Sequence, residues 1–166
     1  MSAPKSLNDV YIEEMRDLWS ANDQMQRVVK SLSEQTTDAK LKKMLEQSVS
    51  GIAQHTSTLR SLLEASGGKV EKDHCRGMEG LVKEAVKHVI DERIENAELR
   101  DLSIIAQYQR MSHYGLAGFG TAAAYAKALG RKDDETKLTS IVRDIYKADE
   151  YGSHVAEMAM KATGKH

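Results

Sequence analysis

Residues 11–32, YIEEMRDLWSANDQMQRVVKSL, decide the fold of this chain. Apolar residues recur in this stretch at alternating steps of four and three, the pattern of a helix that packs on neighbouring helices at shallow angles. Only Asn22 is polar among the positions of this series, which are Tyr11, Met15, Leu18, Asn22, Met25, Val29 and Leu32. The stretch therefore predicts a long bundle helix with a polar residue at the middle of its buried face.

A second stretch, residues 41–62, has the same spacing and is also interrupted near its middle. Its series is Leu41, Leu45, Ser48, Ile52, His55, Leu59 and Leu62. Ser48 and His55 are the interruptions. Residues 35–37 supply a short turn between the two stretches, so we predict that they form an antiparallel helical hairpin with polar groups at mid-length.

Capping signals predict where these two helices begin and end. Ser6 followed by Asp9 resembles a capping box, so the first helix begins there and ends near Ser33. The second helix begins at Thr37 or Asp38. It stops at residues 67–68, two glycines that can adopt the positive φ often needed at a helix C-terminus.

The rest of the chain predicts three further helices. A polar connection over residues 69–76 leads into a shorter helix over residues 78–94, followed by long helices over residues 96–129 and from Asp133 or Asp134 to residue 162. Four long helices with a shorter helix in the connection between the second and third form the ferritin-like arrangement. We expect an all-α fold in one domain, residues 1–166, with its core over residues 6–162.

Composition excludes several classes of protein. Of the 166 residues, 40% are hydrophobic and 30% are charged, and Pro4 is the only proline, so long helices are unobstructed. The formal net charge of -1 argues against nucleic-acid binding. No stretch resembles a signal peptide or a membrane span, and Cys75 is the single cysteine. We therefore expect a cytoplasmic protein with no nucleic-acid or membrane partner.

Glycines interrupt the third long helix. Gly115, Gly118 and Gly120 lie in an otherwise strongly helical stretch, where each glycine costs about 1 kcal/mol relative to alanine. We interpret them as a packing feature that lets another helix approach closely or lets aromatic rings lie flat; a local kink is the alternative.

Two runs of residues carry a family resemblance. They are residues 75–82, CRGMEGLV, followed by Glu84, and residues 105–130, with Ala106-Gln107, His113-Tyr114 and Gly120-Thr121, closing on Ala128-Leu129-Gly130. Over residues 7–158 the chain resembles the YciE/YciF family of bacterial ferritin-like stress proteins. The resemblance implies a five-helix ferritin-like domain, a homodimer and an association with stress.

The resemblance also implies that the family's dimetal centre is degenerate here. Two divalent ions in a bundle core need several inward acids to neutralise them. At positions where the family has acids, this chain has Asn22 in the first helix, Ser50 or Gly51 in the second, Ser112 and Gly115 in the third and Tyr146 in the fourth. Only Asp144, Asp149 and Glu150 are nearby acids. We expect no metal, no other cofactor and no catalytic residues, with Tyr146 filling the vacated volume.

Four polar residues remain near the predicted centre: Asn22, His55, His113 and Asp149. Our interpretation is one polar layer across the bundle, in which a His–Asp pair satisfies the buried carboxylate. The alternative is one weakly bound iron or zinc ion held by His55, His113 and Asp149. His74 beside Cys75 could suggest thiol or metal chemistry, but a capped helix start explains that pair better.

The sequence leaves three possible functions, each from a different class of protein. The first is a non-enzymatic ferritin-like stress-response protein that acts through association, with a second copy or with a related ferritin-like protein. The second is a metal-dependent oxidoreductase, either a ferroxidase or a peroxide-consuming enzyme. The third is a small-molecule binder in the vacated centre. A homodimer is also suggested by apolar residues outside the two series, namely Val10, Trp19, Val28, Met44, Val49 and Leu63.

Overall fold

The computed structural model describes residues 3–67 and 69–163, and within them every regular element is helical. The long helices are α1 (Leu7–Gln35), α2 (Ala39–Ala65), α4 (Ala97–Ala128) and α5 (Lys132–Thr163). The shorter α3 (Arg76–Val86) lies in the connection between α2 and α4 and continues into a π-helical turn, η1 (Lys87–Asp91). The predicted all-α, ferritin-like bundle is confirmed.

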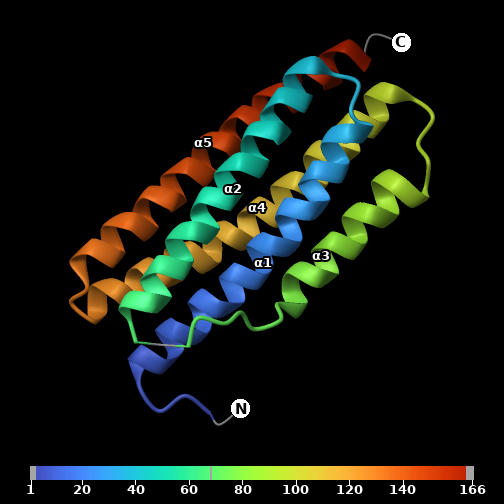
Figure 1. Cartoon of the computed structure of the whole chain (residues 1–166). Helices are drawn as coiled ribbons and strands as arrows, with labels where there is room; N and C mark the ends of the chain where they lie inside the picture. The colour runs from blue at the N-terminus through green and yellow to red at the C-terminus, as the bar shows by residue number, and fades with distance from the viewer. Residues whose placement is uncertain (1–2, 68, 164–166) are drawn as a thin grey trace.

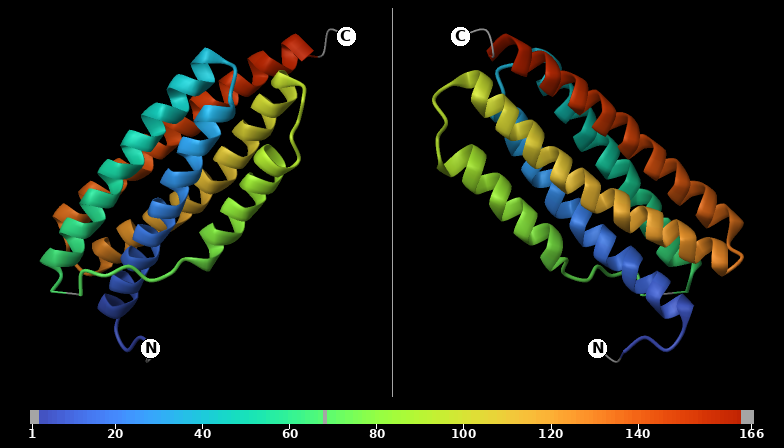
Figure 2. Two further views of the ribbon diagram at one scale, coloured as in Figure 1. Left: turned by 45° about the vertical axis from the view of Figure 1, so that its right-hand side comes forward. Right: turned by 180° about the vertical axis from the view of Figure 1, so that it is seen from behind.

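The four long helices form a bundle in which α1 packs on α2 and α4, and α5 packs on α4 and α2 (Figures 1 and 2). Helix α3 runs beside α1 and α4 and covers the side of the bundle away from α2 and α5. Helix α1 therefore contacts three helices. This position explains its wide apolar stripe, since Val28 is buried in the same cluster as Val82 and Val86 of α3.

The helix ends agree with their predicted capping signals. The Ser6 hydroxyl accepts a hydrogen bond from the Asp9 amide, and the Asp9 carboxylate accepts one from the Ser6 amide, which completes a capping box. Asp38 caps α2, and Gly67 has a φ of 69° after its last turn. Gly68, the second predicted stop residue, lies outside the described residues.

A buried carboxylate fixes the turn between α1 and α2 to the start of α4. Asp101 accepts hydrogen bonds from the Thr36 hydroxyl at 2.7 Å and from the Asp38 amide at 3.0 Å. It also accepts bonds from the hydroxyl and the amide of Thr37. Four donors satisfy a side chain that would otherwise be costly to bury. This contact sets how α4 lies against the α1–α2 hairpin.

One of the three glycines in α4 marks a close helix approach. A Cβ atom at Gly118 would lie 2.5 Å from Leu18 Cδ2 and 3.1 Å from Glu14 Oε1, both on α1. A Cβ atom at Gly115 would meet only Ile145 at 3.8 Å, and one at Gly120 would meet nothing within 4 Å. The packing interpretation is therefore confirmed for Gly118.

The buried apolar residues form two clusters, one toward each end of the bundle. On α1, Leu18 belongs to one cluster and Met25 to the other, with Asn22 between them. On α2, Ile52 and Leu59 are divided in the same way around His55. Two of the polar interruptions predicted from the sequence, Asn22 and His55, thus lie at mid-length where the two clusters divide, whereas Ser48 lies within one cluster, between Leu45 and Ile52. In the described part of the chain, no helix is both long and apolar enough to cross a membrane.

Candidate functional site at the bundle centre

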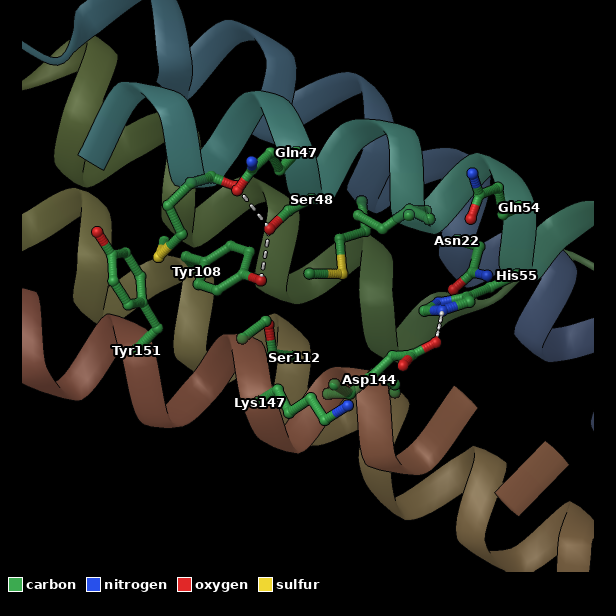
Figure 3. Close-up of a pocket in the computed structure, with 17 residues that line it drawn as sticks. Asn22, Gln47, Ser48, Gln54, His55, Tyr108, Ser112, Asp144, Lys147 and Tyr151 are labelled. Carbon is green, nitrogen blue, oxygen red and sulfur yellow. Dashed lines mark hydrogen bonds and ion pairs between the residues drawn. The ribbon is translucent and has the colours of Figure 1, made fainter. Parts of the chain in front are cut away.

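A pocket of about 400 Å³ lies at this mid-length level, between α2 and α5. Figure 3 shows α2 and α5 along its two sides, with Asn22 of α1 and Tyr108 and Ser112 of α4 reaching it between them. Helices α2 and α5 contact each other less extensively than α1 contacts α2 or α4 contacts α5. The looser packing of this pair leaves the pocket open to solvent.

Two polar side chains in this pocket have no partner. Asn22 is 5% exposed and Ser112 is 3% exposed. The Asn22 Nδ2 and Ser112 Oγ atoms are buried without a hydrogen-bond partner among the described residues. Buried amides and hydroxyls are nearly always paired, so these two groups are available to something that enters the pocket.

His55 reaches the pocket from α2 and faces Asp144 of α5. Its Nε2 atom lies 3.6 Å from Asp144 Oδ2, and its ring meets the Phe119 ring edge-on at 6.0 Å between centroids. Burial lowers the pKa of His55, and the neighbouring Asp144 opposes that shift without reversing it. His55 is therefore neutral near pH 7, and its Nε2 atom faces Asp144 on α5.

The other polar groups of the pocket have partners or lie exposed at its opening. Ser48 donates to the Met44 carbonyl and also shares a hydrogen bond of 2.8 Å with the Tyr108 hydroxyl. Asp144 and Lys147 lie exposed on α5, and among the described residues they are the only lining residues with a full charge when His55 is neutral. Apolar residues make up most of the remaining wall: Met25, Met44, Ile52, Ile145 and Ala148.

The predicted single polar layer is wrong. Asn22 and His55 do share the pocket, but His113 is directed outward, with a side chain 59% exposed, and pairs with Asp149 at 3.1 Å. The adjacent residue, Ser112, is the one that faces the pocket, and successive residues of a helix point about 100° apart. The His–Asp pair therefore lies between α4 and α5 outside the pocket.

The predicted role of Tyr146 is also wrong. Its side chain is 57% exposed, and it does not line the pocket, whereas its neighbour Ile145 does. Gly51, Ser112 and Gly115 line the pocket as their assigned positions require, but Ser50 is exposed. The volume that Tyr146 was expected to fill is open.

The residues at this centre do not fit a dimetal site. Among the described residues, Asp144 is the only acid that lines the pocket, and the other possible ligands there are the His55 imidazole and neutral amides and hydroxyls. Among the residues that the structure describes, no three His, Cys, Asp or Glu side chains are grouped so that they could hold a metal ion. The alternative ligand set of His55, His113 and Asp149 is likewise not brought together, because His55 pairs with Asp144 instead.

Cys75 lies away from this pocket and has a structural role. It is the N-cap of α3, where its sulfur accepts a bond from the Met78 amide, and its Sγ lies 3.0 Å from the Tyr114 hydroxyl. That hydroxyl also donates to Asp17. The capped helix start predicted for this position is confirmed. Burial raises the pKa of the Cys75 thiol, so it is not an activated nucleophile.

Comparison with known proteins agrees with this architecture. Residues 6–163 match the family described as a domain of unknown function, DUF892. The chain belongs to this family. It is 31% identical over 127 residues to protein YciF of Escherichia coli K12, a match that covers 76% of this chain and 75% of that protein. The family resemblance predicted from residues 75–82 and 105–130 is thereby confirmed.

Solved structures place the DUF892 fold among ferritin-like proteins. The crystal structure of the E. coli stress protein YciF matches with a TM-score of 0.87 at 27% identity and covers 98% of this chain and 100% of that one. A ferritin-like, diiron-carboxylate protein from Bacillus anthracis matches with a TM-score of 0.71 at 12% identity, over 92% of this chain and 99% of that one. The second likeness concerns the fold alone.

Proposed function

We propose that this DUF892 protein is a non-enzymatic, ferritin-like stress-response protein that lacks a dimetal centre and acts through association with a second copy of itself. The observation that carries the proposal is the charge of the bundle centre. Two divalent ions bring four positive charges, and Asp144 is the one acid lining the pocket. Burying the uncompensated charge would cost more than the roughly 5–15 kcal/mol that stabilises a domain.

Metal analysis and iron oxidation test the absence of the centre. The untagged protein, purified without added iron or chelator, is expected to contain far less than one iron per chain and to show no saturable oxidation of ferrous iron. Ferrous iron is also expected to leave the melting temperature unchanged, because a ligand stabilises only the state that it binds. Saturable oxidation that disappears in His55→Ala would overturn this part of the proposal.

Exposed apolar side chains on α5 support self-association. Tyr151 and Met158, seven residues apart on one face of the helix, are 44% and 54% exposed. Large apolar side chains that share an exposed face are a feature of interaction surfaces. The similarity to YciF, which is described as a stress protein, supports a stress function, and a reducing cytoplasm suits the free thiol of Cys75.

Light scattering tests the self-association. At micromolar concentration we expect a mass of twice 18.5 kDa for the natural chain. Met158→Lys should shift the mass toward that of the monomer, whereas Glu157→Lys, a charge change at the exposed neighbouring position, should shift it less. A natural chain that stays monomeric under these conditions would contradict the proposal.

A further inference from the structure

The unpaired groups of the central pocket define what a ligand must offer. Asn22 presents amide N–H donors and Ser112 presents a hydroxyl, and both residues are more than nine-tenths buried. The Ser48 hydroxyl, in the same pocket, already has two partners. Because Asn22 Nδ2 can only donate, the ligand must carry an acceptor oxygen that reaches the Asn22 and Ser112 side chains.

The charges of the pocket indicate an uncharged ligand. Asp144 and Lys147 carry opposite charges and lie exposed on α5, so neither provides a buried counter-charge. His55 is neutral, since burial lowers its pKa. A carboxylate or an ammonium placed next to Asn22 and Ser112 would lose its hydration without a compensating ion.

The walls and the volume of the pocket indicate the apolar character and the size of the ligand. Met25, Met44 and the Tyr108 ring line the pocket, and thioethers and aromatic rings pack favourably against another ring. The cavity of about 400 Å³ lies within the range of small-molecule sites. At about 30 Å³ per water-sized group it holds roughly a dozen non-hydrogen atoms.

We infer that this pocket binds a small, uncharged molecule that has an apolar ring and a carbonyl oxygen, with the oxygen accepting hydrogen bonds from Asn22 and Ser112. The inference rests on the proposed function in one respect: the ligand would occupy the space that a dimetal centre needs. Iron content and ligand binding are separate measurements, so the proposed absence of a dimetal centre and the proposed ligand binding can each be refuted without the other.

Three probes of similar shape test the class of ligand. Acetophenone has the ring and the carbonyl, ethylbenzene lacks the acceptor, and benzoate carries a charge. We expect saturable binding of acetophenone by protein-observed NMR, with shifts in the side-chain amide of Asn22, and affinity about three- to tenfold higher than for either other probe. Equal binding of ethylbenzene, tighter binding of benzoate, or no saturable binding of acetophenone would overturn the inference.

Matched serine variants test the assigned contact. Ser112→Ala should lower acetophenone affinity about three- to tenfold and leave ethylbenzene affinity unchanged. Ser50→Ala removes a hydroxyl at an exposed position of α2 outside the pocket and should change the acetophenone preference less than twofold. Asn22→Leu keeps the branched shape of the side chain, removes the donor and should abolish the preference. Unchanged preference in folded Ser112→Ala and Asn22→Leu proteins would show that the polar groups do not recognise the ligand.

Discussion

His55 of α2 and Asp144 of α5 face each other across the opening of the central pocket, with 3.6 Å between Nε2 and Oδ2. The pair joins the two neighbouring helices that pack least tightly in the bundle. Its imidazole is largely buried, with 14% of the side chain exposed, whereas the carboxylate is 56% exposed. Desolvation of His55 therefore outweighs the attraction of Asp144, which lowers the histidine pKa.

This shift predicts how stability depends on pH. Between the lowered pKa of folded His55 and its ordinary value of 6.5, the unfolded chain binds more protons, so stability falls as pH falls through this window. His55→Gln should remove that part of the decrease. Chemical denaturation at pH 7.5 and pH 5.5 would measure it, with His154→Gln, an exposed position on α5, as the control. If His55→Gln and the natural chain lose the same free energy of unfolding between pH 7.5 and pH 5.5, the account of His55 is contradicted.

Substitution of Asp101 should cause a large loss of stability. Asp101→Ala leaves the Thr36 and Thr37 hydroxyls and two turn amides without their acceptor, which should cost about 2–4 kcal/mol. Glu98→Gln, an exposed change one turn earlier on α4, should cost less than about 0.5 kcal/mol. Urea denaturation compares the two variants, and similar midpoints would show that the hydrogen bonds to Asp101 contribute little to stability.

Alanine substitutions at two glycines of α4 should change the stability of the protein in opposite directions. Gly120→Ala adds a Cβ atom where there is open space and should stabilise the protein by up to about 1 kcal/mol through helix propensity. Gly118→Ala places its Cβ atom against the fully buried Leu18, whose displacement would disturb the packed core, and should destabilise by about 1–3 kcal/mol. Thermal unfolding of both variants checks the order, and a Gly118→Ala protein as stable as Gly120→Ala would refute the close approach of α1.

The His113–Asp149 pair should contribute little to stability. Its aspartate side chain is only 20% exposed, but its histidine side chain is 59% exposed, so solvent screens the pair, and ion pairs of this kind are worth about 1 kcal/mol at most. Asp149→Asn should therefore lower the free energy of unfolding by less than about 1 kcal/mol, well below the effect of Asp101→Ala. A loss of several kcal/mol in urea denaturation would mean that Asp149 belongs to the core after all.

Periodicity was enough to predict the helices and the residues at the heart of the site. Asn22 and His55 interrupt regular apolar series, and both line the pocket because the series itself defines the inward face. His113 was misplaced because it was chosen for its chemistry and not for its position in such a series. Tyr146 was misplaced because it was assigned by alignment with an acid of the related family, whereas its neighbour Ile145 is the residue that faces inward.

Other features depend on contacts that no local pattern reports. Asp101 meets Thr36 across 65 positions of the chain, and nothing in the sequence around either residue signals that contact. The open pocket depends on how far α2 and α5 separate, which results from packing along their whole length. Unpaired atoms such as Ser112 Oγ become visible only when every neighbour is placed.

The most direct test of the central claim is an anomalous-scattering map of crystals grown with excess ferrous iron and measured at the iron edge. The proposed absence of a dimetal centre predicts no pair of iron peaks beside Asn22, His55 and Ser112. Two iron atoms at full occupancy, about 3.5–4 Å apart at this level of the bundle, would contradict it.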